Sequence, residues 1–385
     1  MQFEFATAAR IIFGCGKISE VAPIAKQMGD RALVICGKNL GRVGTFLDML
    51  AAQKVEYITF QVIDEPTIRI VEEGINLARQ IDCDFVIGIG GGSVIDTGKV
   101  IAALFTNHGK LFDYLEVIGC GKKLTRKPAQ FIAIPTTSGT GAEVTRNAVL
   151  KSSEHGIKVS MRSPLMLPDL TVVDPELTYS MPCSVTASTG LDALTQLIEA
   201  FVTKKANPLT DSICREGIKR AARSLKQAYL NGNDRNARND MSIASLFSGM
   251  ALANAGLGAV HGFAGPLGGI FPAPHGVICA RLLPFVMEAN IRTLKTQPSN
   301  SPVLVRFDEI AKILTGKSDA IAEDGMEWVL SICKMLKVQS LSKYGLKEED
   351  FPAIIEKSRK ASSMEGNPVR LSNKDLTQIL KKTLF

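Results

Sequence analysis

The stretch CDFVIGIGGGSVIDTGK, residues 83–99, decides the fold of this chain. It opens with an apolar run without polar alternation, which is typical of a strand covered on both faces, as in a parallel sheet. Three glycines follow at 90–92, and a helical pattern begins near Ser93. A strand, a glycine-rich turn and a helix in this order predict one unit of an α/β fold.

Further units of this kind lie on both sides of it. Short β-branched runs predict strands at 31–37, 55–62, 129–137 and 170–175, and an amphipathic helix is predicted at 67–80. This alternation implies right-handed crossovers and a parallel sheet. Beyond Pro182 the strand signals fade, and helical patterns follow at 184–203, 208–230, 239–255, 303–316, 321–337, 348–359 and 374–383. We therefore predict a Rossmann-like α/β domain over residues 1–180 and an all-helical domain over residues 181–385, with an exposed loop at 295–302.

The composition excludes several classes of protein. Of the 385 residues, 45% are hydrophobic, which is too many for a disordered chain, and no apolar run is long enough to span a membrane. The net charge of +7 comes without a basic stripe interleaved with aromatic residues, so we expect no nucleic-acid partner. The first ten residues lack the layout of a secretory signal. Eight scattered cysteines without a CxxC pair, including Cys279 in GVICA, suit buried side chains in a reducing compartment better than disulfides or a thiolate metal site. We expect a cytoplasmic protein without a membrane partner.

Two loops predict a phosphate-containing ligand. GIGGGSVIDTGK (88–99) combines glycines that allow close backbone approach with a helix N-terminus that attracts anions, although a tight structural turn would use the same residues. The loop matches neither the GxGxxG fingerprint nor a Walker A motif. PTTSGTGAEVT (135–145) follows another apolar strand and is rich in hydroxyl groups. Because ligands bind at the carboxyl edge of such sheets, two loops of this kind predict a nucleotide site more strongly than one.

A different group of residues marks the helical half. Two of the four histidines, His261 and His275, lie fourteen residues apart in VHGFAGPLGGIFPAPHG, where we expect the prolines to form a turn. Upstream, Asp192 and Gln196 share one helical face in TGLDALTQLIEAF. One aspartate and two imidazoles are able to hold a divalent ion with an open position for a substrate oxygen. Ordinary buried histidines remain the alternative.

Four segments together resemble the iron-containing (group III) alcohol dehydrogenase family. They are GGGSVIDTGK (90–99), PTTSGTGAEVT (135–145), the helix DALTQLIEA (192–200) and the segment from His261 to Gly276. They stand in the order and spacing of that family, and the likeness runs from FGCGK (13–17) to about residue 290.

The resemblance implies a dehydroquinate synthase-like two-domain fold and an enzyme that interconverts alcohols with aldehydes or ketones. It implies NAD or NADP as cofactor, a divalent metal (Fe²⁺, with Zn²⁺ as the alternative), and a homodimer or larger homo-oligomer. The catalytic metal position maps onto Asp192, Gln196, His261 and His275. The cofactor-binding positions map onto Gly90, Gly91, Gly92, Ser93, Asp96, Thr136, Thr137, Thr140, Thr145 and Lys158.

The chain departs from the family pattern at two positions. Gln196 stands where the family has a third histidine ligand, and Gly265 stands where many relatives carry another histidine. An amide oxygen is a poorer donor than imidazole, so metal affinity or metal identity is expected to change. The missing histidine puts the usual proton path in doubt.

Two residues after the first predicted strand bear on the choice of cofactor. Gly37 and Lys38 stand where NAD-preferring relatives place an acidic residue. Glycine leaves room for a 2′-phosphate and lysine is able to pair with it, so the sequence favours NADP over NAD.

The mechanism we expect is transfer of a hydride between nicotinamide and a substrate whose oxygen a metal polarises. The alternatives are a metal-free carbonyl reductase of the same fold, a catalytically weakened nucleotide-binding relative, and a lyase related to dehydroquinate synthase. Survival of activity after chelation would distinguish the first alternative, and cofactor binding without turnover the second.

Overall fold

The computed structural model describes residues 2–296 and 301–385 and divides them into two compact units. The α/β unit comprises Thr7–Thr137 and Gly141–Tyr179, and the helical unit begins at Ser180. Two short segments, the residues before Thr7 and Ser138–Thr140, group with the helical unit. Their hydrogen bonds explain this: Ala6 donates its N–H to Asn254 (2.7 Å), and the Ser138 hydroxyl contacts that of Ser242 at 3.2 Å. Part of the predicted loop at 295–302 lies outside the described residues.

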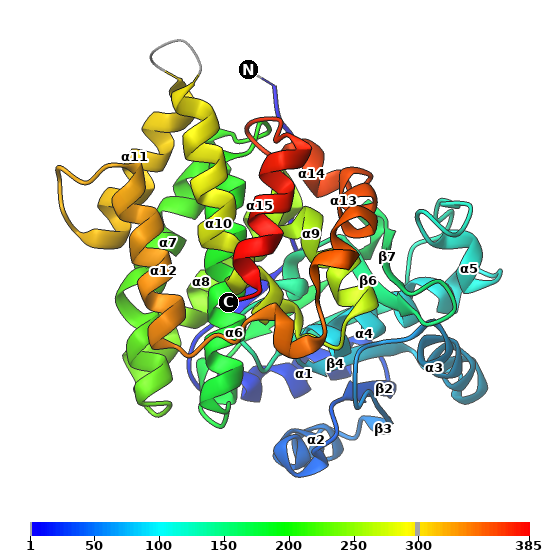
Figure 1. Ribbon diagram of the computed structural model, residues 1–385. Coiled ribbons are helices and arrows are strands. Elements are labelled where there is room, and N and C mark those ends of the chain that lie inside the picture. The colour runs from blue at the N-terminus through cyan, green and yellow to red at the C-terminus, as the bar shows by residue number, and fades with distance from the viewer. Residues whose placement is uncertain (1, 297–300) are drawn as a thin grey trace. The chain divides into compact units, whose positions relative to one another are not determined.

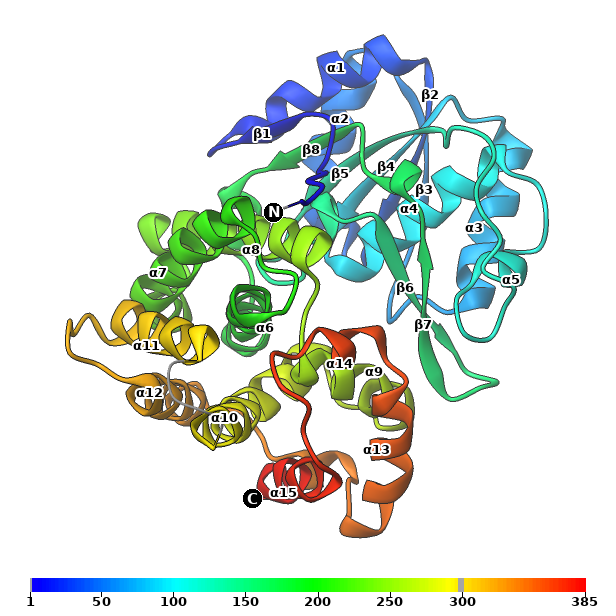
Figure 2. The same ribbon diagram turned by 90° about the horizontal axis from the view of Figure 1, so that it is seen from above.

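A six-stranded parallel sheet forms the centre of the α/β unit (Figures 1 and 2). Its strand order is β1-β8-β5-β4-β2-β3, and its strands are β1 (Ile11–Phe13), β2 (Arg31–Cys36), β3 (Glu56–Gln61), β4 (Phe85–Gly90), β5 (Gln130–Pro135) and β8 (Leu170–Val173). All neighbouring pairs are parallel. The prediction of a parallel α/β domain followed by a helical part is confirmed.

Apolar residues on both faces of the sheet explain its runs without polar alternation. Along β2 and β4, Val34 and Ile87 pack into one cluster with α1 (Val21–Met28) and α2 (Gly44–Ala52). The alternate residues Leu33 and Val86 pack into a second cluster with α3 (Ile68–Ile81) and α4 (Gly92–Thr106). The short helix α5 (Leu111–Tyr114) adds to the second cluster.

An antiparallel hairpin also belongs to this unit, although the sequence pattern did not indicate it. Its strands are β6 (Asn147–Ser152) and β7 (Ile157–Arg162). Every second residue of β6 is buried, so the hairpin covers the second cluster with one face only.

One helix, α6 (Cys183–Val202), lies at the centre of the helical unit. Every residue of α6 from Gly190 onward is buried. Because this helix is enclosed, polar side chains on it must find partners inside the unit. Its neighbours are α7 (Pro208–Leu230), α8 (Arg235–Ala255) and α10 (His275–Lys295). The remaining helices are α9 (Ala259–Ile270), α11 (Pro302–Thr315), α12 (Ala322–Met335), α13 (Phe351–Arg359), α14 (Ser362–Gly366) and α15 (Asn373–Thr383).

Three of these helices, α9, α10 and the short α14, were not predicted from the sequence pattern. Pro266 was interpreted as part of a turn, but it lies inside α9, and Pro284 lies inside α10. Proline disfavours helix interiors because it lacks an N–H and crowds the preceding turn, at a cost of about 3 kcal/mol. Burial of Phe263, Leu267 and their neighbours in the core of the unit outweighs that preference.

No single helix among the described residues is both long and apolar enough to cross a membrane. Within the part of the chain that the structure describes, α8 and α9 taken together, with a bend of 101° between them, are the one pair that meets the length and composition criteria.

Candidate active site

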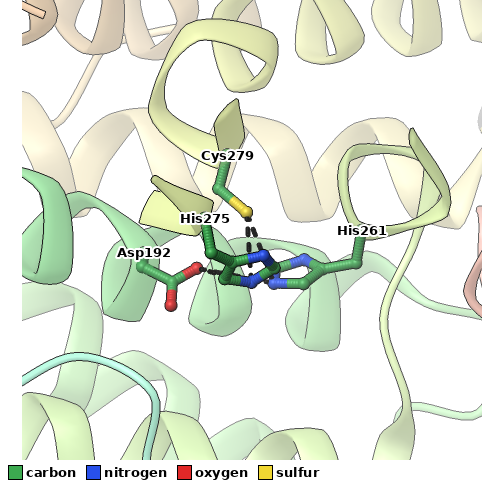
Figure 3. Close-up of side chains that lie close together, drawn as sticks. All are labelled: Asp192, His261, His275 and Cys279. Atoms are coloured by element: carbon green, nitrogen blue, oxygen red, sulfur yellow. Dashed lines mark hydrogen bonds and ion pairs between the residues drawn. The ribbon is translucent and has the colours of Figure 1, made fainter. Parts of the chain in front are cut away.

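Four side chains from three helices of the helical unit converge on one point (Figure 3). Asp192 comes from α6, His261 from α9, and His275 and Cys279 from α10. Asp192 Oδ1 lies 3.5 Å from His261 Nε2 and 3.6 Å from His275 Nε2. The Cys279 Sγ lies 3.7 Å and 3.6 Å from the same two nitrogens. The four ligand atoms all lie within 4.8 Å of one another.

Both histidines lie near the N-terminal end of their helices, His261 in α9 and His275 in α10. Pro274 precedes α10, so His275 occupies the first position of that helix. His261 is the third residue of α9 and is enclosed, with 8% of its side chain exposed. His275 is 36% exposed and is the part of the group most open to solvent.

The donor set fits a divalent cation. Among the described residues, Asp192 Oδ1 is buried and makes no hydrogen bond, although two imidazole nitrogens face it. A buried charged oxygen without a hydrogen bond is costly unless a cation is present. Burial opposes ionisation of Asp192, but the neighbouring His275 and His261 hold its pKa below the ordinary value. For His261, burial also opposes the charged form, but Cys279, Asp192 and Glu199 raise its pKa well above the ordinary value. The group therefore attracts positive charge.

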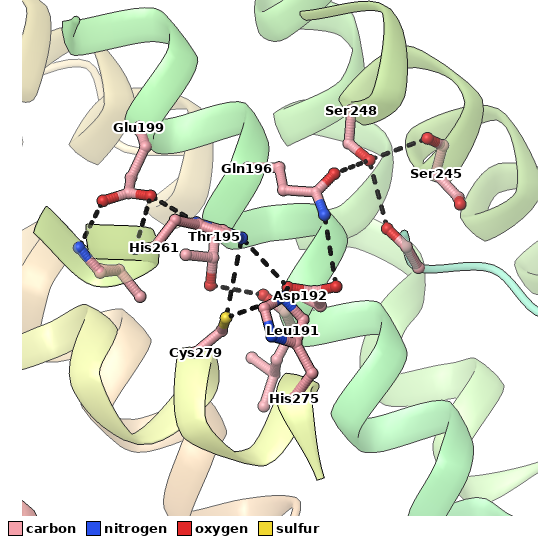
Figure 4. Close-up of polar contacts among 12 residues, drawn as sticks. Leu191, Asp192, Thr195, Gln196, Glu199, Ser245, Ser248, His261, His275 and Cys279 are labelled. Carbon is pink, nitrogen blue, oxygen red and sulfur yellow. Dashed lines mark hydrogen bonds and ion pairs between the residues drawn. The ribbon is translucent and has the colours of Figure 1, made fainter. Parts of the chain in front are cut away.

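A second layer of polar residues orients the first (Figure 4). Glu199 Oε2 lies 2.6 Å from His261 Nδ1. An ionised carboxylate only accepts hydrogen bonds, so Nδ1 carries a proton and Nε2 is the nitrogen that faces Asp192. Gln196 donates through Nε2 to Asp192 Oδ2 (3.3 Å), while its Oε1 accepts a hydrogen bond from the Ser248 hydroxyl (2.9 Å). Gln196 therefore lies beside the four converging side chains, and its oxygen is engaged elsewhere.

Replacing Glu199 with Gln is expected to weaken divalent metal binding by about 10- to 100-fold, as does the loss of other carboxylates that orient a ligating histidine. A neutral amide holds the imidazole less firmly than a carboxylate does. Competition with a chromophoric chelator measures the dissociation constant. The matched control is Glu216→Gln, because Glu216 pairs with Arg220 near the surface of α7. Equal affinity in Glu199→Gln and wild type would contradict the orienting role.

Two members of this site were not singled out from the sequence. Glu199 lies seven residues after Asp192, at helical spacing on the same face, within the segment DALTQLIEA that carries the family resemblance. Cys279 lies one helical turn after His275 but was interpreted as a core residue because of its apolar neighbours. At Gly265, an added Cβ would meet nothing within 4 Å, so the fold leaves room for a larger side chain there.

The predicted cofactor loops in the α/β unit follow three neighbouring strands. Gly37 and Lys38 follow β2, Gly91 caps the N-terminus of α4 after β4, and Thr136 follows β5. The Thr136 N–H donates to the Gly90 carbonyl at 2.9 Å, which ties two of the loops together. A Cβ on Gly91 would contact the Thr137 side chain at 3.5 Å. The open N-terminus of α4 at this edge suits a pyrophosphate.

Four other residues predicted to bind the cofactor are Asp96, Thr140, Thr145 and Lys158. Asp96 accepts a hydrogen bond from the Val149 N–H (2.9 Å), and Thr145 accepts one from the buried Lys99 ammonium (2.8 Å). Lys158 forms an ion pair with Glu65. Thr140 groups with the helical unit. The contacts of Asp96, Thr145 and Lys158 are with neighbouring side chains and backbone of their own unit.

A buried acid completes the charge cluster around Lys99, and it predicts a pH-dependent stability. Burial raises the pKa of the Glu143 carboxyl from 4.5 to about 7. An acid whose pKa is higher in the folded state destabilises folding as pH rises between the two values. At about 1.4 kcal/mol per pKa unit, the penalty approaches a maximum of about 3.5 kcal/mol well above pH 7.

Glu143→Gln is therefore expected to raise the free energy of unfolding by up to about 3 kcal/mol at pH 8 and to change it little near pH 4.5. Urea unfolding at the two pH values measures the difference. The exposed Glu154→Gln serves as control and should leave the profile unchanged. A gain of equal size at both pH values would contradict the assignment.

Comparison with protein families matches both halves of the chain. Residues 8–175 match the model described as iron-containing alcohol dehydrogenase, and residues 186–384 match that of the Fe-containing alcohol dehydrogenase family, C-terminal. Alcohol dehydrogenase 4 of Schizosaccharomyces pombe is 34% identical over 379 residues, which cover 97% of this chain and 87% of that protein. The 1,3-propanediol dehydrogenase of Citrobacter freundii is 33% identical over 393 residues, with coverage of 99% and 98%.

Solved structures agree with these matches. A 1,3-propanediol oxidoreductase superposes with a TM-score of 0.91 at 32% identity and 100% coverage of both chains. Sulfoacetaldehyde reductase from Bifidobacterium kashiwanohense, solved in complex with NAD⁺, superposes with a TM-score of 0.88 at 27% identity, with coverage of 100% of this chain and 99% of that one.

Proposed function

The chain belongs to the iron-containing alcohol dehydrogenase family of oxidoreductases, and on this premise we propose that Asp192, His261 and His275 hold its catalytic metal. The substrate would be a small alcohol and its aldehyde or ketone. The convergence of these three side chains around the Asp192 oxygen, which makes no hydrogen bond within the described chain, carries the proposal. Metal dependence and alcohol dehydrogenase activity are the properties for which the family is named.

A divalent ion at this position supplies a Lewis acid that polarises the substrate oxygen, and a bound nicotinamide supplies or accepts the hydride. The protein's own residues prepare the site. Gln196 and Ser248 hold Oδ2 of Asp192 so that Oδ1 stays directed at the imidazoles. Glu199 keeps the proton of His261 on Nδ1. These contacts fix the ligand atoms before the ion arrives, so binding costs little reorganisation.

For the cofactor, we propose that the loops after β2, β4 and β5 receive the dinucleotide, with its pyrophosphate at the N-terminus of α4. NADP is the proposed form. The support is that Gly37 has open space around its Cβ position and that Lys38 is exposed beside it. A cytoplasmic location and a homo-oligomeric state belong to the same proposal. All eight cysteines are free, as a reducing compartment requires.

A panel of small alcohols and aldehydes with NAD(H) and NADP(H) tests the proposed function through the absorbance of the reduced nicotinamide. We expect turnover that depends on an added divalent metal. Cofactor binding without turnover under Fe²⁺, Zn²⁺ and Co²⁺ would contradict the proposal and support a nucleotide-binding relative.

Gly37→Asp is expected to lower kcat/KM for NADP by at least about tenfold, a loss of about 1.4 kcal/mol, because the carboxylate repels the 2′-phosphate. Activity with NAD should fall less or rise. Lys38→Ala is the companion variant and should affect NADP alone. Steady-state kinetics with both cofactors give the ratio of kcat/KM for NADP to kcat/KM for NAD. A wild-type enzyme that already prefers NAD would contradict the proposal that NADP is the cofactor.

A further inference from the structure

We propose that Cys279 is the fourth protein ligand of the metal, and that the resulting Asp192–His261–His275–Cys279 set selects Zn²⁺ over Fe²⁺. The inference rests on the proposed function, since it concerns the same ion. It assigns to Cys279 the place that the sequence pattern left to Gln196.

Four of the six ligand-to-ligand distances within the cluster match a tetrahedral site. With bonds of about 2.1 Å to nitrogen or oxygen and about 2.3 Å to sulfur, tetrahedral ligands lie about 3.4 Å apart for oxygen and nitrogen and about 3.6 Å apart for sulfur and nitrogen. The observed separations from Asp192 Oδ1 to the imidazole nitrogens are 3.5 and 3.6 Å, and those from Cys279 Sγ are 3.7 and 3.6 Å. Each is within 0.2 Å of the value expected for a shared ion, and the two separations from Asp192 are longer than a normal hydrogen bond.

The surroundings of the Cys279 thiol differ from those of an ordinary core cysteine. Cys333 is also buried in the helical unit, and its Sγ contacts the Ala280 carbonyl oxygen at 3.3 Å. Cys279 instead directs its sulfur at the two imidazole nitrogens (Figure 3). Its place one turn after His275 puts both side chains on the same face of α10.

Gln196 is not available for this position. Its Oε1 accepts the Ser248 hydroxyl, and its Nε2 donates to Asp192. Exchanging the two ends of the amide would place its oxygen against the Asp192 carboxylate, which is repulsive. Gln196 is thus a positioning residue for Asp192.

A thiolate donor changes which metal the site prefers. Soft sulfur ligands and the order of divalent stabilities both favour Zn²⁺ over Fe²⁺. On binding, the sulfur–metal bond forms as the thiol proton leaves to solvent. Four protein ligands do not close the site to substrate, since Zn²⁺ coordination is able to expand to five.

Cobalt substitution of the full-length protein tests the inference without an activity assay. Apo-protein is titrated with Co²⁺, and the thiolate-to-cobalt charge-transfer band in the near ultraviolet is recorded for wild type, Cys279→Ser, Cys333→Ser and Gln196→Ala. X-ray absorption of the Zn²⁺ form of the wild type seeks one sulfur at about 2.3 Å. Anaerobic competition between equimolar Zn²⁺ and Fe²⁺ measures the preference by elemental analysis.

The inference expects the charge-transfer band in wild type, Cys333→Ser and Gln196→Ala, its loss in Cys279→Ser, and a Zn²⁺ preference that drops at least about tenfold in that variant. Stoichiometric Co²⁺ binding by wild type without the band, or zinc without a sulfur neighbour, overturns the inference and leaves the proposed function intact. Failure of wild type to bind any divalent ion overturns both. If Cys279→Ser does not fold, the X-ray absorption spectrum of the wild-type Zn²⁺ form decides, because it shows directly whether a sulfur atom binds the metal.

Discussion

Asp192→Asn is expected to reduce kcat/KM for alcohol oxidation by at least about a thousandfold and to leave the purified protein nearly free of metal. The change keeps the shape of the side chain but removes the one carboxylate charge that both imidazoles face. Loss of a Lewis acid that stabilises developing charge by several kcal/mol corresponds to three decades or more in rate. Elemental analysis and steady-state kinetics on the same preparation measure both effects.

Asp240→Asn is the matched control for loss of a buried carboxylate. Asp240 is also buried in the helical unit, where it binds Arg220, Arg223 and Ser224. We expect it to lower stability, because it leaves two guanidinium groups with weaker partners, but to retain metal. Full metal content and activity in Asp192→Asn would show that the converging side chains are not the catalytic centre.

Removing the metal by chelation is expected to abolish turnover and to lower the midpoint of thermal unfolding. An ion that binds only the folded protein stabilises it by about 4 kcal/mol when its free concentration is a thousand times the dissociation constant. Dialysis against a strong chelator, followed by differential scanning calorimetry and activity assays before and after addition of Zn²⁺ or Fe²⁺, measures both losses and their recovery.

The chelation experiment also distinguishes the alternative mechanism. A metal-free reductase of this fold would polarise the carbonyl with protein donors, and its activity would survive the chelator and His275→Ala. Asp192→Asn is the control for nonspecific effects of the chelator, because its unfolding midpoint should not respond to metal removal. Activity that persists in fully metal-depleted wild type would establish the alternative.

Local sequence patterns predicted most of the fold correctly. The strands at 31–37, 83–92 and 129–137 correspond to β2, β4 and β5, and the helix at 67–80 corresponds to α3. The strands were indicated by short β-branched apolar runs and the helix by apolar residues at helical spacing, signals that the local sequence alone supplies. The helices α9 and α10 were missed because Pro266 and Pro284 disfavour helix locally, whereas burial in the helical unit favours it. The hairpin β6–β7 was also missed; its strands, NAVLKS and IKVSMR, mix polar and charged residues with apolar ones.

The residues of the candidate site also fall into two groups, those identified from the sequence and those whose places only the structure reveals. Asp192, His261 and His275 were identified by residue type and by their resemblance to family motifs, and the structure brings them together. The places of Gln196, Glu199 and Cys279 depend on contacts between helices that are distant in sequence. Glu199 reaches His261 across 62 positions, and Ser248 reaches Gln196 across 52. Spacing within one helix shows which residues share a face, but not what that face meets.

By itself, the sequence determined the class of fold, the family and the residue types able to bind a nucleotide and a metal, because these follow from short-range periodicity and from motifs of a few residues. Only the tertiary structure decided which atoms converge: that the oxygen of Gln196 is occupied by Ser248, and that the sulfur of Cys279 faces two imidazoles. The physical reason is that coordination requires several donor atoms within a few ångströms of one point. Such proximity between α6, α9 and α10 is created by packing, which no local pattern encodes.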